Sequence, residues 1–104
     1  MEEKKFNIKG IAVDILTDEW LEEDIINKTP ITIKKIQKRP GGFTIYMDAP
    51  FEKIEWYFSK GLTTVKIIKG KKAPYIRIEH EDGIYWVDIP YNKEITDYLK
   101  EYIK

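Results

Sequence analysis

Few side chains in this sequence could act in catalysis. His80 is the only histidine, Ser59 is the only serine, and there is no cysteine. The lack of cysteine excludes thiol catalysis and thiolate metal sites, and a single histidine excludes sites built on several imidazoles. A catalytic triad would require Ser59 and His80 to meet in space. With eighteen acidic residues, a carboxylate pair such as Glu79 and Glu81 identifies no site.

Motifs for phosphate and metal binding are also missing. The sequence contains neither a GxxxxGK[ST] nor a GxGxxG run. Basic glycine turns at residues 39–42 and 69–72 lack the following helix that a phosphate cradle requires. The run His80-Glu81-Asp82 could hold a hard cation, but adjacent polar residues at a hairpin tip are typical of turns. We therefore predict no enzyme, no cofactor and no metal site.

Charge is segregated along the chain. Residues 1–27 hold three basic and eight acidic residues, a net charge of −5, and residues 28–72 hold eleven basic and three acidic, a net of +8. Residues 73–104 hold four basic and seven acidic, a net of −3. The total charge of zero argues against a dedicated nucleic-acid binder, but the segregation creates two candidate surfaces.

The acidic segment is the first candidate surface. Trp20 has Glu19, Glu23 and Asp24 close to it in the sequence. An exposed tryptophan ringed by carboxylates could anchor a basic protein partner, because aromatic residues dominate interface energetics. The alternative is that Trp20 packs on the sheet and the acids are merely solvated. Strand addition at a sheet edge is another route to a protein partner.

The basic segment is the second candidate surface. Lysines would bind a nucleic-acid backbone electrostatically, and exposed bases would stack on aromatic rings. The residues for this alternative are Lys35, Lys38, Arg39, Lys69, Lys71, Lys72, Tyr46 and Tyr57. The competing explanation is that the lysines pair with the acidic flanks or protect sheet edges. Arginine, the preferred reader of bases and phosphates, occurs only twice, so nucleic acid stays the alternative to a protein partner.

The first elements that must position these residues are a strand and a helix. Residues 6–16 are apolar and β-branched, which predicts a strand with Gly10 at a bulge or sharp bend. Thr17 and Asp18 can each cap a helix, and the acids that follow favour its N-terminal half. Trp20, Leu21, Ile25 and Ile26 would share one face. We therefore predict an acidic helix over residues 18–27, closed before Pro30.

Strands dominate the remainder. Alternation over residues 31–49, broken at Lys35-Ile36 by a bulge, predicts a hairpin around a turn at residues 39–42. Residues 51–60 fit either a strand, which we prefer for its aromatic content, or a helix. Residues 62–69 form another strand, and residues 75–80 and 84–89 form a hairpin. After Pro90, the side chains at Ile95, Leu99, Tyr102 and Ile103 predict an amphipathic C-terminal helix.

This order of elements over residues 31–104 resembles a pleckstrin-homology-like domain. The segment YIRIEHEDGIYWVDIPYNKEITDYLKEYI carries the final hairpin and helix. The resemblance implies a strongly bent seven-stranded sheet plugged at one end by that helix. A helix at residues 51–60 would leave six strands, and the resemblance would then fail. The acidic residues 18–27 lie where phosphoinositide-binding members carry basic ones, so lipid binding is not implied.

These patterns predict one α+β domain over residues 1–104, with a bent antiparallel sheet of six or seven strands, an acidic helix after the first strand and a capping helix. No apolar run approaches the roughly 20 residues of a membrane span, and the N-terminus lacks an apolar signal core, so we expect a cytoplasmic chain. Eighteen isoleucines to four leucines and sixteen lysines to two arginines fit an AT-rich genome and also a thermophile. The expected function is a small protein-binding module, acting as a monomer or a homodimer.

Overall fold

The computed structural model describes residues 2–18, 20, 23–80 and 84–103. In this part of the chain, seven strands are followed by one short α-helix and a 3-10 turn. Their bounds are β1 (Glu3–Asp18), β2 (Glu23–Arg39), β3 (Gly42–Asp48), β4 (Lys53–Ser59), β5 (Thr63–Lys69), β6 (Pro74–His80), β7 (Tyr85–Pro90), α1 (Lys93–Tyr98) and η1 (Lys100–Tyr102).

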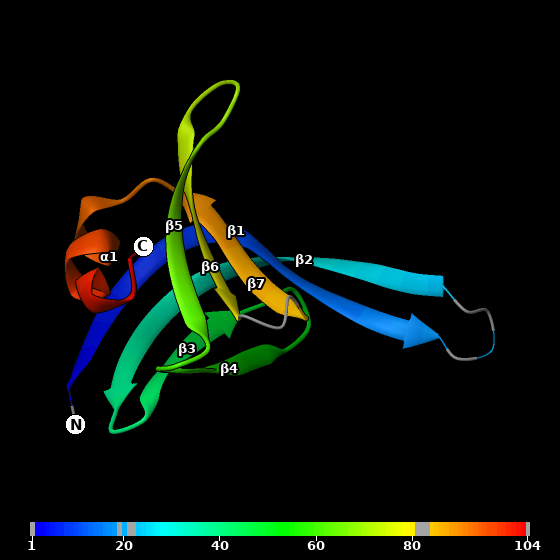
Figure 1. The fold of residues 1–104 in the computed structure, drawn as a ribbon, viewed down its shortest axis with the longest axis horizontal. Coiled ribbons are helices and arrows are strands. Elements are labelled where there is room, and N and C mark those ends of the chain that lie inside the picture. The colour runs from blue at the N-terminus through cyan, green and yellow to red at the C-terminus, as the bar shows by residue number, and fades with distance from the viewer. Residues whose placement is uncertain (1, 19, 21–22, 81–83, 104) are drawn as a thin grey trace.

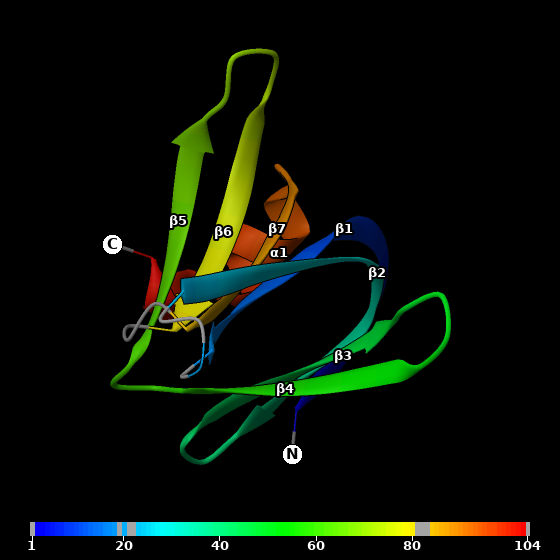
Figure 2. The ribbon, with the colours of Figure 1, turned by 90° about the vertical axis from the view of Figure 1, so that its right-hand side faces the viewer.

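The seven strands form one antiparallel sheet in the order β4-β3-β2-β1-β7-β6-β5. All neighbours in the sheet are also neighbours in sequence except β1 and β7, which pair over Ile11–Asp14 and Tyr85–Asp88. Figures 1 and 2 show the sheet folded over, with β5–β7 crossing above the half made of β2–β4. Strand β1 therefore joins the two halves.

The predicted fold class, α+β with an acidic helix after the first strand, is wrong. The structure is 70% strand and 10% helix, with one short α-helix in its described part. Of residues 18–27, predicted as a helix, Asp18 instead ends β1 and residues 23–27 begin β2, where Leu16 pairs with Ile25 and Ile15 with Ile26. Pairing with the preceding strand satisfies the backbone of this segment, and this non-local interaction outweighs the local helix signals.

Other expected elements are present with small changes in their bounds. Residues 53–59 form a strand, so the helical alternative for residues 51–60 is wrong. The β2–β3 hairpin turns at residues 39–42, and its register shifts between Ile33 and Lys35, one position before the predicted bulge. The β6–β7 hairpin matches the predicted pair of strands. In β1 the register shifts between Lys5 and Ile8 rather than at Gly10.

The core lies between the two halves of the sheet and the C-terminal helix. Phe43 stacks on Phe58 at 5.3 Å between ring centroids and meets the Tyr102 ring edge-on at 4.8 Å. The fully buried side chains include Ile33, Ile36, Ile45, Met47, Val65, Ile76, Ile78, Ile89, Ile95 and Leu99. The period-two alternation directs those of them that lie on strands to one side of the sheet, and Ile95 and Leu99 come from the C-terminal helix and its cap.

The C-terminal helix closes one end of the core. Asn92 caps it, because its Oδ1 accepts a hydrogen bond of 3.1 Å from the Ile95 backbone N–H. Ile95, Leu99 and Tyr102 are buried and Ile103 is partly buried, but the helix is shorter than predicted: α1 ends at Tyr98, Tyr102 belongs to η1, and Ile103 forms a parallel bridge with Val65 of β5. None of the helices in the described residues is long and apolar enough to cross a membrane.

Gly42 is required at the start of β3. Its φ is +154°, a conformation that residues with a side chain rarely adopt. A Cβ atom there would also collide with the Phe58 carbonyl oxygen of β4. The glycine therefore lets β4 approach β3 closely where the β2–β3 hairpin ends.

The side chain of Tyr98 in α1 packs against the core and buries its hydroxyl group there. Its hydroxyl oxygen is buried with no hydrogen-bond partner among the described residues, although Lys38 Nζ lies 4.4 Å from the ring centroid. Burial raises the pKa of this hydroxyl, and Glu2 and Glu3 raise it further. The folded state therefore favours the neutral Tyr98 phenol. The contribution of this preference to the free energy of unfolding is lost as the pH rises above about 10, because Tyr98 ionises at lower pH in the unfolded chain than in the folded one.

Tyr98→Phe is expected to keep or raise the free energy of unfolding at pH 7, by up to about 1 kcal/mol, because it removes a buried unsatisfied hydroxyl. It should also reduce the loss of stability above about pH 10. Urea unfolding at both pH values measures these effects. Tyr91→Phe, at a half-exposed tyrosine, is the control and should leave stability at pH 7 unchanged. A clear loss of stability in Tyr98→Phe at pH 7 would contradict the assignment.

Candidate functional site

A two-stranded hairpin arm extends from the body of the sheet. Strand β7 contacts β1 no further than Asp14, apart from the Ile15 N–H that donates to Ile84 O at 2.8 Å. Strand β3 pairs with β2 only from Thr32 onward. In the described part of the chain, residues 15–18 and 23–26 thus pair as strands only with each other. We call these residues and Trp20 the hairpin arm, and Figure 1 shows it pointing away from the other strands.

The hairpin arm exposes large apolar side chains on both of its faces. Leu16 is 52% exposed and its register partner Ile25 is 45% exposed. On the opposite face Ile26 is 57% exposed, and Trp20 between the two strands is 96% exposed. Isolated two-stranded hairpins are only marginally stable in water, and clustered exposed apolar residues mark binding surfaces.

The hairpin arm is also acidic. Glu23 and Asp24 are exposed at the start of β2, and no lysine or arginine occurs between Gly10 and Asn27. At the base of the arm, the Asn27 side chain donates a 3.1 Å hydrogen bond to Asp14. The predicted protein-binding residues Trp20, Glu23 and Asp24 thus lie together on an exposed element, although that element is a hairpin and not a helix. Glu19 lies outside the described residues.

Sequence reasoning missed the apolar part of this surface. It placed Ile25 and Ile26 on one face of a helix, whereas strand pairing sends them to opposite faces beside Leu16 and Ile15. The sequence did offer one signal for a hairpin: the β-branched pair Ile25-Ile26 favours a strand, and this strand would directly follow another one.

The residues of the nucleic-acid alternative do not form one surface. Lys35 and Tyr46 are register partners on the outer face of the sheet, next to Arg39 and Tyr57. Lys38 pairs with Phe43, so it lies on the opposite face. Lys69, Lys71 and Lys72 belong to the β5–β6 turn, which lies at the far side of the molecule from the β2–β3 turn.

Several of these basic groups are already engaged. Lys35 forms an ion pair of 3.3 Å with Glu3, and Lys38 one of 4.0 Å with Glu101. The Arg39 guanidinium donates hydrogen bonds of 2.9 Å to Thr44, 3.0 Å to Gln37 and 2.9 Å to Tyr46. Lys35 and Lys38 thus pair with acidic residues near the two ends of the chain, whereas the Arg39 guanidinium bonds to neutral side chains.

The structure brings Ser59 and His80 together. Ser59 Oγ and His80 Nε2 lie 3.5 Å apart, and the His80 ring stacks on Tyr85 with centroids 5.0 Å apart. The Tyr85 hydroxyl donates a 2.6 Å hydrogen bond to the Tyr57 carbonyl. The three cavities on this molecule that we describe are lined by neither Ser59 nor His80. Within the described residues, no group of three or more His, Cys, Asp or Glu could hold a metal ion.

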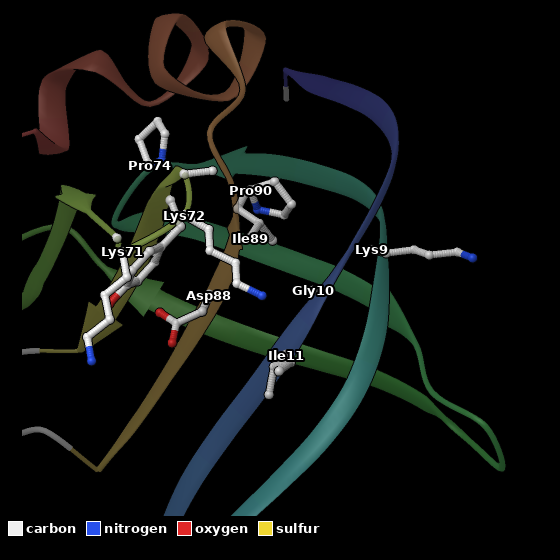
Figure 3. A pocket seen from close by; sticks show the side chains of 12 residues that line it. Lys9, Gly10, Ile11, Lys71, Lys72, Pro74, Asp88, Ile89 and Pro90 are labelled. Atoms are coloured by element: carbon white, nitrogen blue, oxygen red, sulfur yellow. The ribbon is translucent and has the colours of Figure 1, made fainter.

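The largest of these cavities, about 730 Å³, lies where β1 meets β7 and the β5–β6 turn. We call it the β1–β7 pocket (Figure 3). Its lining residues are Lys9, Gly10, Ile11, Gly70, Lys71, Lys72, Ala73, Pro74, Tyr75, Asp88, Ile89 and Pro90. The other two, of about 410 and 420 Å³, lie on the outer face of the sheet around Tyr46 and around Pro30.

Asp88 is the single acidic residue of the β1–β7 pocket lining. Arg77 donates hydrogen bonds of 2.8 and 3.1 Å to the two carboxylate oxygens of Asp88. This hydrogen bonding raises the pKa of Arg77, against an opposing effect of desolvation. Because the Asp88 charge is neutralised, the lysines determine the charge of the pocket.

No protein-family model, curated protein or solved structure matches this chain. The resemblance to pleckstrin-homology-like domains therefore stays a prediction.

Proposed function

We propose that this chain is a non-enzymatic protein-interaction module that binds its partner through the hairpin arm. The observation that carries the proposal is the exposure of Leu16, Ile25 and Ile26 on an arm that lacks a third strand. Ile33 and Ile36, further along the same strand β2, are completely buried, whereas Ile11 of β1 and Ile67 of β5 are exposed to a similar extent as the side chains of the arm. A partner that covers the hairpin arm would make apolar contacts with these exposed side chains, which the other strands of the sheet do not cover.

Burial of these side chains provides a favourable energy of binding. Removing the exposed half of one leucine or isoleucine side chain from water contributes about 1 kcal/mol. Trp20, almost fully exposed, has the side chain type that most often dominates protein interfaces. The acids Glu23 and Asp24 favour a partner surface that is basic around an apolar centre.

The nucleic-acid alternative has weaker support. Of its eight residues, only Lys35, Arg39, Tyr46 and Tyr57 share a face, and the side chains of the first three make ion pairs or hydrogen bonds within the fold. Fluorescence anisotropy with labelled oligonucleotides tests it directly. Saturable binding that weakens with salt and is lost when Lys35 and Arg39 are replaced by alanine would favour nucleic acid over a protein partner.

Site-specific photo-cross-linking in the cells that produce the protein tests the proposed function. A photoreactive residue at Ile26, in the arm, should give a discrete protein adduct, whereas one at Lys60, exposed in the β4–β5 turn, should not. Trp20→Ala should remove most of the adduct while changing the free energy of unfolding by less than about 0.5 kcal/mol, because the side chain is exposed. Equal adducts at both positions, or none, would contradict the proposal.

A further inference from the structure

The β1–β7 pocket combines an apolar floor with a positive rim. Ile11, Tyr75 and Pro90 contribute apolar surface, and Ile11 is 44% exposed there. Lys71 and Lys72 contribute two ammonium groups on the side of the β5–β6 turn, whereas Figure 3 shows the side chain of Lys9, which also lines the pocket, directed away from them. Since Arg77 neutralises Asp88, the lining has an excess of positive charge.

The hairpin arm has the complementary chemistry. It presents Trp20 and Leu16 together with Glu23 and Asp24, so it is apolar and negative where the pocket is apolar and positive. A cavity of about 730 Å³ is large enough to accept an aromatic side chain with its neighbours. In a pair of copies joined in this way, the acids of each arm would face the lysines of the opposing pocket.

The arm cannot reach the pocket of its own chain. Ile11 lines the pocket, and β1 continues from there to Asp18 as one uninterrupted strand. Seven residues of strand span about 23 Å. The arm therefore holds Trp20 far from the pocket, and Figure 1 shows it directed away from the β5–β6 turn.

We infer that the partner of the hairpin arm is a second copy of this chain, and that the arm of one copy docks in the β1–β7 pocket of the other. The inference rests on the proposed function, because it names the partner of the same arm. Each copy presents both the hairpin arm and the β1–β7 pocket. Reciprocal exchange of arms about a two-fold axis would satisfy both contacts in a closed dimer.

Sedimentation velocity of the purified chain tests the inference, over protein concentrations from about 10 µM to about 1 mM. We expect reversible self-association that weakens with added salt, because the docking surfaces have opposite charge. Two variants reverse the charges separately: Lys71→Glu with Lys72→Glu in the pocket, and Glu23→Lys with Asp24→Lys in the arm. Each should weaken self-association at least about tenfold.

The decisive measurement is made on a mixture of the two variants. In an equimolar mixture, each reversed surface meets a partner of opposite charge, so association should return to near the original strength. Lys53→Glu with Lys60→Glu is the control, because it changes the net charge equally at exposed positions outside the β1–β7 pocket, and it should leave self-association unchanged. Circular dichroism checks that all variants are folded.

A chain that stays monomeric at every concentration and at low salt would overturn the inference, as would a mixture that fails to associate. If the chain is monomeric but Ile26 still cross-links to a different protein, the proposed function stands and only the identity of the partner is wrong. If neither self-association nor a cross-link is found, both fail.

Discussion

Phe43→Ala is expected to lower the free energy of unfolding by about 3–5 kcal/mol. Phe43 is completely buried, where it stacks on Phe58 of β4 and contacts Tyr102 of η1. Truncation leaves a cavity between one half of the sheet and the C-terminal segment, and the surrounding strands can collapse only partly. Domains of this size have total stabilities of about 5–15 kcal/mol, so much of the stability would be lost.

Urea unfolding followed by circular dichroism measures this change. Phe51→Ala is the matched control, because it removes the same atoms from a side chain that is 100% exposed. It should change the free energy of unfolding by less than about 0.5 kcal/mol. Equal effects of the two substitutions would show that the Phe43 ring does not hold the core together.

Gly10→Ala is expected to lower the free energy of unfolding by about 2–3 kcal/mol, although it adds only one methyl group. The new Cβ atom would collide with the Asp88 carbonyl oxygen and would lie 2.6 Å from Ile89 Cγ2. The first of these atoms is backbone of β7, so no rotation of a side chain relieves the collision. Strand β7 must move away from β1 at the point where Ile11 and Asp88 pair.

Gly61→Ala is the control for this substitution, because a Cβ atom there would meet nothing within 4 Å. It should be neutral or stabilise the protein by up to about 1 kcal/mol, since alanine restricts the unfolded chain. Thermal unfolding of both variants, with hydrogen exchange of the β7 amides in Gly10→Ala, measures the effect. Normal stability and unchanged β7 protection in Gly10→Ala would contradict the close approach of the two strands.

The sequence alone determined most of the strands. Residues 43–47, 75–79 and 85–89 alternate between apolar and polar side chains because one face of each strand is buried, and this local pattern predicts a strand without knowledge of its neighbours. The C-terminal helix was equally readable, since Ile95 and Leu99 are spaced for one helical face. Trp20 was predicted as a protein-binding residue from the acids beside it in the sequence, and the structure shows that its side chain is exposed.

Local signals failed at residues 18–27, where they favoured a helix. Whether this segment forms a helix or a strand depended on its pairing with residues 15–18. The energy of that pairing cannot be inferred from a short stretch of sequence. For two residues of the nucleic-acid alternative, the sequence alone indicates that they do not share a face. Lys35 and Lys38 are three residues apart, a spacing that places them on opposite faces of a strand.

Only the tertiary structure decided the β1–β7 pocket. Its lining comes from residues 9–11, 70–75 and 88–90, three segments that are distant in the sequence and carry no common motif. They meet because β7 pairs with β1 on one side and with β6 on the other, so Asp88–Pro90 lie between residues 9–11 and the start of β6. Periodicity reports which face of an element is buried, whereas the long-range packing of the sheet decides which exposed faces lie side by side.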